Sequence, residues 1–179
     1  MHASPLSSNR ACQHGSVAVE FALLSLFVFF PLMLAIIEIG RYMHLYNTMQ
    51  EVTRHAAREA TIRWTSNSDQ TTAKTLAMFN NAQHVPGADE IEIGKISITY
   101  LNKAGSIVSV PPTDAADNMS ACNDALRVAN CIYSVQVQMT DVQFMPFIAK
   151  SLLFDSDLLK ISMPASTVIM YAESMGFTN

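Results

Sequence analysis

A single carboxylate, Glu20, lies beside the longest uncharged run of the 179-residue sequence. The 17 residues from Phe21 to Ile37 carry no charge and, as a helix, cover about 25 Å of a hydrocarbon core about 30 Å thick. Starting the run at Val17 gives 21 residues and about 31 Å, but then includes Glu20. A charge at the bilayer centre costs about 2.5–3.5 kcal/mol, and less near the edge. Glu20 is therefore either solvated among the headgroups or a functional carboxylate that needs a partner.

Cys122 and Cys131 are the next candidates for covalent chemistry. Eight residues separate them, and the third cysteine, Cys12, lies upstream of the apolar run. If this part of the chain is exported, we expect the two to form a disulfide, worth about 2–3 kcal/mol in the entropic account. Two free thiols or a metal pair are the alternatives, although no His or further Cys cluster lies nearby to complete a zinc site.

The sequence contains none of the common catalytic or cofactor-binding motifs. It has no Gly-rich phosphate loop and no H-E-x-x-H, C-x-x-C or Gly-x-Ser-x-Gly pattern. Asp155 and Asp157 suggest a cation loop, but two acids beside a turn are usually just solvated. The net charge of −4 and the lack of a basic block disfavour nucleic acid as a partner. We therefore expect a protein that is not an enzyme and that holds no metal or cofactor.

Three kinds of processing compete at the N-terminal run. An ordinary secretory signal needs a small-x-small site after its apolar core, and residues 35–40 offer no such pattern. An uncleaved signal anchor is the second interpretation. Cleavage before the apolar run, at Gly15, is the third.

The residues around Gly15 resemble a prepilin processing site of the type IVb and Flp kind: a Gly, a cut, four residues, a Glu and an aromatic residue. The wider segment from Gly15 to Ala60 resembles the TadE-like family, minor pseudopilins of Tad (tight adherence) pilus systems. The matching positions are Gly15, Glu20, Phe21, Pro31, Glu38, Gly40, Arg41, Ala56, Ala57 and Arg58.

The resemblance implies that a prepilin peptidase cuts between Gly15 and Ser16. It further implies that Glu20 pairs with the new α-amine of Ser16 on a neighbouring subunit, with Phe21 beside it. The implied partners are the peptidase, other pilins or pseudopilins, the assembly platform and the membrane. The resemblance places the chain in the inner membrane as a single-pass protein with a periplasmic C-terminal domain, and it is compatible with incorporation in the pilus. One observation opposes this topology: the leader has only Arg10, whereas Arg41, Arg54, Arg58 and Arg63 lie on the far side.

The pattern predicts an α+β fold in which a long helix, transmembrane and then amphipathic, packs on a small, mostly antiparallel β-sheet domain. The predicted parts are a leader (1–15), a transmembrane helix (16–40), a helical extension (41–65) and an α+β domain (66–179). The helix runs from about Val17 to Trp64, and Pro31 is expected to kink it. Apolar residues at three- and four-residue steps form its buried stripe: Tyr42, Leu45, Tyr46, Met49, Val52, Ala56 and Ala60.

Beyond the long helix, turn signals and alternation predict the remaining elements. In chain order they are a helix over 70–82 capped by Ser68 or Asp69, a strand over 91–100 with a bulge at Gly94, a turn over 102–105, a return strand over 106–110, a loop over 111–124, a strand over 132–140, a short helix over 144–154 and a last strand over 158–171.

The favoured function is a minor pseudopilin of a Tad/Flp-type pilus that takes part in assembly for surface adherence. The alternative is an unprocessed bitopic inner-membrane scaffold protein of the same apparatus, and a membrane-tethered enzyme or ligand-binding domain is a third candidate. The spacing of Gly15 and Glu20 separates the first two, because a plain anchor needs neither residue.

Overall fold

The computed structural model describes residues 13–80, 84–85, 87–147, 160–172 and 175. The chain divides into two compact units, an N-terminal unit (Met1–Arg41) and a C-terminal unit (Tyr42–Asn179). The predicted four-part division, with boundaries after residues 15, 40 and 65, stays a prediction.

The N-terminal helix is continuous in its backbone. It comprises α1 (Gln13–Leu24), a π-helical turn η1 (Ser25–Phe29) and α2 (Phe30–Ile62). Within the described residues, the stretch Gly15–Ile62 is the one helix long and apolar enough to cross a membrane. The predicted long helix is therefore confirmed and ends two residues before Trp64.

The π-helical turn lies where proline was expected to disturb the helix. Pro31 has no N–H, and its ring collides with the carbonyl group four residues earlier, at Phe27, in a regular α-helix. Directly before it, the Phe30 N–H bonds to the Ser25 carbonyl oxygen, five residues back. The wider turn gives the backbone room ahead of the proline, so the disturbance takes the form of a π turn.

One face of α2 is buried in the C-terminal unit. Leu45, Met49, Val52, Thr53, Ala56, Ala57 and Ala60 are buried there. Tyr42 and Tyr46 pack against the same core from partly exposed positions. The predicted amphipathic stripe is confirmed. By contrast, the apolar side chains of the N-terminal unit, such as Phe27 and Ile36, are exposed.

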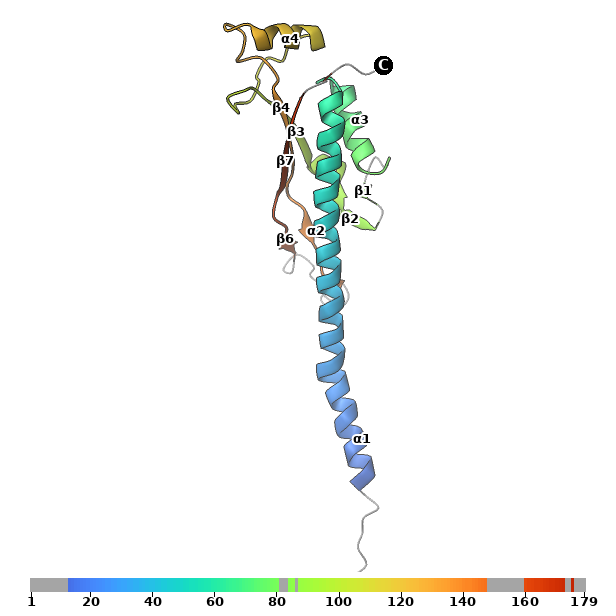
Figure 1. The fold of residues 1–179 in the computed structure, drawn as a ribbon. Coiled ribbons are helices and arrows are strands. Elements are labelled where there is room, and N and C mark those ends of the chain that lie inside the picture. Colours follow the sequence, from blue (N-terminus) through green and yellow to red (C-terminus); the bar gives the residue numbers. More distant parts are fainter. Residues whose placement is uncertain (1–12, 81–83, 86, 148–159, 173–174, 176–179) are drawn as a thin grey trace, which may run out of the picture. The chain divides into compact units, whose positions relative to one another are not determined.

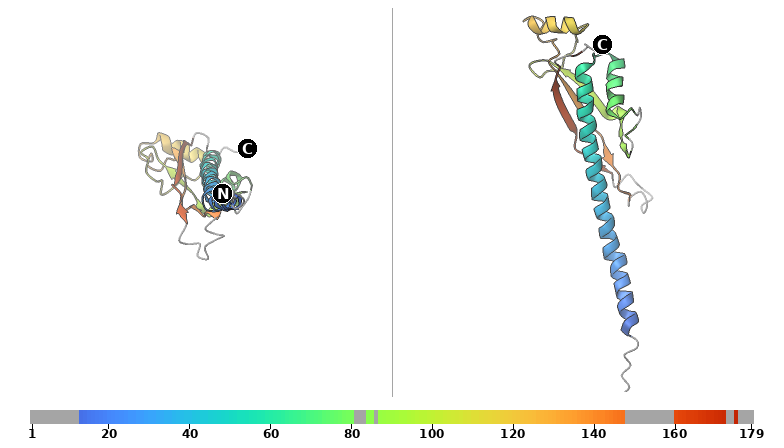
Figure 2. Two further views of the ribbon diagram at one scale, coloured as in Figure 1. Left: turned by 90° about the horizontal axis from the view of Figure 1, so that it is seen from below. Right: turned by 45° about the vertical axis from the view of Figure 1, so that its right-hand side comes forward.

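A three-stranded antiparallel sheet covers the buried face of α2. Its strands are β3 (Ile96–Leu101), β4 (Ser134–Met139) and β7 (Ser166–Tyr171), in the order β3-β4-β7. Ile98, Val137 and Val168 lie side by side across the three strands, and Val137 is fully buried. The sheet lies on one side of α2, and α3 (Asn67–Ala77) lies on another (Figures 1 and 2). The predicted α+β class is confirmed.

The strand predicted over 91–100 is two strands in two different sheets. β2 (Ala88–Glu92) pairs with β1 (His84–Val85) in a short hairpin, and the 3₁₀ turn Ile93–Lys95 then leads into β3. The bulge expected at Gly94 was therefore wrong, because the change in alternation marks a complete turn between sheets.

Helix caps correct two further predictions. The N-cap of α3 is Ser66, whose Oγ accepts a hydrogen bond from the Asp69 N–H, and the helix ends at Ala77, before the positive φ angles of Phe79 and Asn80. The segment predicted as a loop over 111–124 contains α4 (Ala115–Asn123), capped by the Asp114 carboxylate. Pairs such as Asp114 and Asp117, three residues apart, are capping signals that also occur in loops.

The last predictions also change. The return strand over 106–110 is reduced to one bridge, Leu101 to Ile107. The strand over 158–171 is two strands, β6 (Ile161–Ser162) and β7, separated at Pro164, which cannot donate to a ladder. Phe144 lies in β5 (Gln143–Phe144), which pairs with β6, and most of the helix predicted over 144–154 lies outside the described residues.

Shortening one buried side chain of α2 should destabilise the C-terminal unit. Met49 is fully buried, so Met49→Ala should lower the free energy of unfolding by about 2–5 kcal/mol through lost contacts and a cavity. The matched change Glu51→Ala, on the exposed face, should stay within about 0.5 kcal/mol. Fluorescence of the single tryptophan, Trp64, during denaturation of the detergent-solubilised chain measures both. An equal loss of stability in the two variants would contradict the conclusion that the buried face of α2 stabilises the C-terminal unit.

Candidate functional site

The four N-terminal site residues predicted from the sequence share the first turns of one helix. Gly15, Ser16, Glu20 and Phe21 all lie in α1, and the Gly15–Ser16 bond is part of its backbone. The Ser16 hydroxyl donates to Oε1 of Glu20, one turn later, over 3.4 Å. The side chain of Phe21 is 71% exposed. Among the described residues, these side chains lie on an exposed helix surface.

Gly15 is not required by packing within the chain. A Cβ atom added at this position would meet nothing within 4 Å. Its backbone is helical, a conformation that any residue except proline adopts readily. The described structure therefore gives no reason for glycine at this position.

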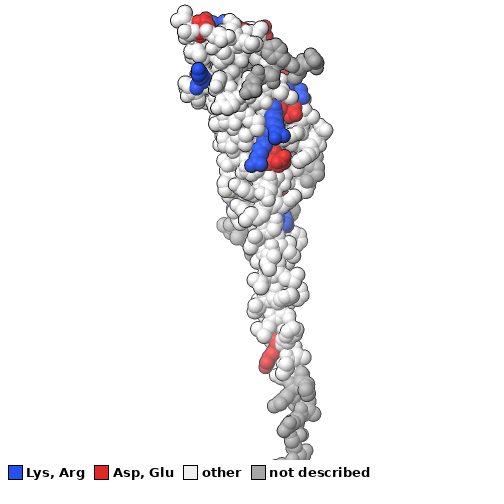
Figure 3. Space-filling model, viewed as in Figure 1, with Lys and Arg blue, Asp and Glu red and all other residues white. Residues whose placement is uncertain are grey.

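Glu20 has no charged partner among the described residues; its hydrogen bond there comes from Ser16. No Lys, Arg, Asp or Glu follows it until Glu38, and Figure 3 shows the uncharged surface of this part of the helix. A carboxylate on an apolar helix is costly unless it is paired or solvated. The geometry leaves Glu20 open to a cation supplied from outside the helix.

The first charged residues after Glu20 lie at the C-terminal end of the apolar run, one turn before the buried stripe. Arg41 Nη1 lies 3.1 Å from Glu38 Oε2, and the two residues are three positions apart on α2. This spacing brings side chains together on one helix face. The pair marks the change from an uncharged helix to an amphipathic one.

Comparison with known proteins now bears on this segment. Residues 15–58 match the model of the family described as TadE-like protein. No curated protein and no solved structure matches the chain. The TadE-like segment, residues 15–58, confirms the resemblance seen in the sequence, and it includes Gly15, Glu20, Phe21 and the Glu38–Arg41 pair. It ends within α2 and does not reach the sheet.

Outside the TadE-like segment, Cys122 and Cys131 form the predicted disulfide, with their Cα atoms 4.8 Å apart. The bridge joins the end of α4 to the chain that enters β4. Asn118, also on α4, is only 7% exposed. Its amide group donates to the Ile132 carbonyl oxygen over 3.2 Å and accepts from the Ile132 N–H over 2.8 Å. The bridge and these two hydrogen bonds fix α4 to the end of the sheet.

An ion pair holds the loop inside the disulfide. Nη2 of Arg127 lies 2.6 Å from Oδ1 of Asp117, whose other oxygen accepts from the Thr113 N–H over 3.1 Å. The hydrogen bond from Arg127, followed by the one from Thr113, lowers the pKa of Asp117. Leu126 nearby is 94% exposed. Sequence reasoning missed both the ion pair and Asn118, because the loop prediction hid the helix that positions them.

The described residues contain no group of three or more His, Cys, Asp or Glu side chains arranged to hold a metal ion. Asp155 and Asp157, which suggested a cation loop, lie outside the described residues. Of the candidate sites, the N-terminal helix end is thus the one that combines several predicted residues in one place.

The Asp117–Arg127 pair should respond to acid. Because the folded chain lowers the pKa of Asp117, the pair's contribution to stability is full above the ordinary aspartate pKa and is lost as the pH falls through the lowered value. We expect the Thr113 amide signal, followed by NMR in micelles, to titrate below the ordinary aspartate range. Arg127→Gln should raise that midpoint. An unchanged midpoint in this variant would show that the guanidinium does not set the pKa.

Proposed function

We propose that this chain is a minor pseudopilin of a Tad/Flp-type pilus, cut by a prepilin peptidase and taking part in pilus assembly for surface adherence. The observation that carries the proposal is the TadE-like match over residues 15–58, which includes the exposed apolar helix and Glu20, a carboxylate without a charged partner among the described residues. The family match suggests association with a Tad pilus and a structural rather than an enzymatic role.

The apolar helix suggests membrane anchoring. We place the anchor in the inner membrane as a single pass, with the leader up to Gly15 cytoplasmic and the C-terminal unit periplasmic. The disulfide supports this orientation, because disulfides persist in oxidising compartments. The partners are then the peptidase, neighbouring pilins or pseudopilins and the inner-membrane assembly platform.

Cleavage after Gly15 would supply the cation that Glu20 lacks. The new α-amine of Ser16 would lie four residues before Glu20, which is about 6 Å along a helix. Two parallel helices staggered by this amount bring the amine of one chain level with the carboxylate of the other. In a weakly hydrated setting such a pair attracts strongly, and each charge alone is costly. Glu20 would therefore act in subunit contact rather than in folding.

The second candidate is an unprocessed bitopic scaffold protein of the same apparatus. One observation favours it: Arg41, Arg54, Arg58 and Arg63 follow the apolar run, while the leader has Arg10 alone. Positive residues tend to stay cytoplasmic. A scaffold would use the same helix as a plain anchor and would need neither Gly15 nor Glu20.

The first test is the N-terminal residue of the membrane-extracted chain, determined by mass spectrometry. Co-expression with the prepilin peptidase should give a chain that begins at Ser16. Gly15→Ala should leave the chain uncut, and this change fits the structure without a clash. A chain that begins at Met1 in both proteins would reject processing and favour the scaffold.

The second test separates assembly from folding. Glu20→Gln keeps the size and hydrogen bonding of the side chain but removes its charge, so processing and membrane insertion should persist. The amount of this chain recovered with other pilus subunits should fall about tenfold, the loss expected for one moderately strong ion pair. Glu51→Gln, on the exposed face of α2, is the matched control. Equal recovery of the two variants would refute pairing through Glu20.

A further inference from the structure

Among the described strands, β7 is an edge of the main sheet, and the register shows which of its backbone groups face away from β4. Ala172 N–H donates to the Tyr133 carbonyl oxygen over 3.1 Å, in line with the β4–β7 register. In an antiparallel pair, residues alternate between bonding to the neighbour and facing away. The N–H and C=O groups of Thr167, Ile169 and Tyr171 therefore point away from β4.

Within the part of the chain that the structure describes, this edge lacks the features that usually protect edge strands. No other described strand pairs with β7. Its sequence, STVIMY, has no charge and no proline, and Ile169 and Tyr171 are 58% and 66% exposed. Natural edges are commonly blunted by charge, proline or bulges, because an open edge is a template for another strand. The β7 edge is thus suited to strand addition.

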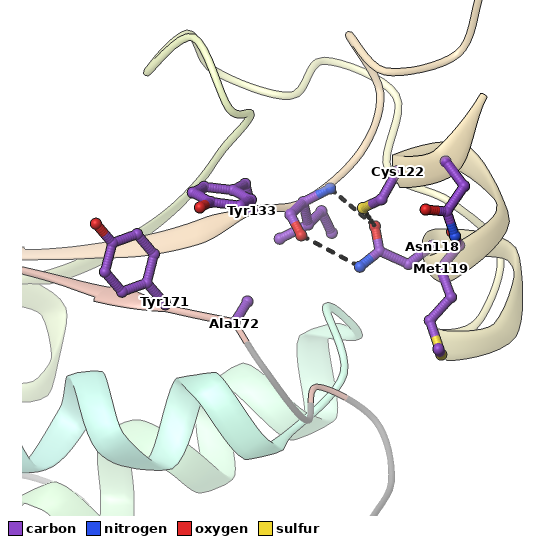
Figure 4. Close-up of a pocket in the computed structure, with 8 residues that line it drawn as sticks. Asn118, Met119, Cys122, Tyr133, Tyr171 and Ala172 are labelled. Carbon is purple, nitrogen blue, oxygen red and sulfur yellow. Dashed lines mark hydrogen bonds between the residues drawn. The ribbon is translucent and has the colours of Figure 1, made fainter. Parts of the chain in front are cut away.

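A pocket of about 470 Å³ lies where β7 ends. It is lined by Asn118, Met119, Cys122, Asn123, Ile132, Tyr133, Tyr171 and Ala172. Figure 4 shows the two tyrosines on the strands and the α4 residues across the pocket from them. The tyrosine rings meet edge to face, with their centroids 5.4 Å apart. Tyr171 belongs to both features, so the C-terminal end of the edge adjoins the pocket.

The described lining of the pocket is held in place by local bonds and carries no charge. Its α4 side is held by the Cys122–Cys131 disulfide and by the two hydrogen bonds of Asn118 to Ile132. None of the lining side chains that the structure describes is Asp, Glu, Lys, Arg or His. A charged group entering it would lose hydration without gaining an ionic partner. The occupant is therefore uncharged where it contacts the edge and the pocket.

We propose that the β7 edge and this pocket bind an extended, uncharged peptide segment of a partner protein as an added antiparallel strand. Backbone hydrogen bonds to Thr167, Ile169 and Tyr171 supply affinity, and an apolar or aromatic side chain in the pocket supplies specificity. Because the segment runs against β7, its N-terminal end lies at the pocket. This inference is independent of the pilus proposal, since it rests on residues outside the TadE-like segment.

A synthetic peptide with the sequence of residues 133–140, YSVQVQMT, is a suitable probe. The same sequence already pairs with β7 on its other side, with Tyr133 beside Ala172, so it presents an aromatic residue at the pocket. Binding to the full chain in detergent micelles is measured by fluorescence anisotropy of the labelled peptide. We expect saturable binding below about 1 mM, the weak affinity of a short, flexible strand.

Two singly N-methylated peptides test the binding mode. Methylation of the backbone nitrogen of the peptide residue opposite Ile169 removes an N–H donor that faces the β7 edge. This change should weaken binding of the peptide about tenfold. Methylation of the next residue, whose N–H faces away, should change the affinity less than about twofold. Equal binding of the two peptides, or no binding of the parent peptide, would overturn strand addition whether or not any protein variant folds.

Protein variants test the pocket and the identity of the occupant. Tyr171→Ala should weaken binding of the probe about tenfold, and Ser97→Ala, exposed on β3, should not. For a second copy as occupant, Ile169→Cys is compared with Ser97→Cys under oxidation, both in a Cys12→Ser background. A disulfide-linked dimer specific to Ile169→Cys would assign the edge to a second copy and overturn the proposal.

Discussion

Burial of one face of α2 is the contact on which the C-terminal unit depends. Met49, Val52 and Ala56 are fully buried, and the inward residues of β3, β4 and β7 complete the same core. Small residues at Ala56, Ala57 and Ala60 let neighbouring elements approach the helix closely. Without this face the three-stranded sheet would expose its apolar side to water. The helix α4 and the pocket are positioned by the sheet, and the sheet is positioned by its packing on α2.

The same helix has two different surfaces along its length. Its N-terminal half is apolar all round and exposed, which suits lipid or neighbouring helices, and its C-terminal half is apolar on one face. The Glu38–Arg41 ion pair lies at the change between them. Within the apolar half, Glu20 and Pro31 are the two costly residues. Proline is accommodated by a π turn inside the chain. The carboxylate of Glu20, by contrast, has no charged partner among the described residues.

At the end of the sheet next to α4, a rigid region lies beside an exposed strand edge. The disulfide, the amide of Asn118 and the Asp117–Arg127 pair hold α4 and its loop in place. Beside this braced region, β7 keeps an uncharged edge and the two tyrosines stay partly exposed. A preformed site loses less conformational entropy on binding than a flexible one. Unprotected edges carry a risk of aggregation, because they can pair with a strand of another chain.

The sequence by itself determined the long helix, its buried stripe, the disulfide partners and the candidate N-terminal site, because these depend on local periodicity and on spacing along one chain. Tertiary structure alone decided where Ile91 and Ile96 belong, since the two residues lie in strands of different sheets across a turn at Gly94. It also decided how α4 is fixed to the sheet, because the Asn118 amide bonds to the backbone of Ile132, 14 residues away. The free edge of β7 and its pocket were likewise invisible in the sequence. Strand order is set by packing between residues far apart in the chain, and no local pattern encodes which strand is left unpaired.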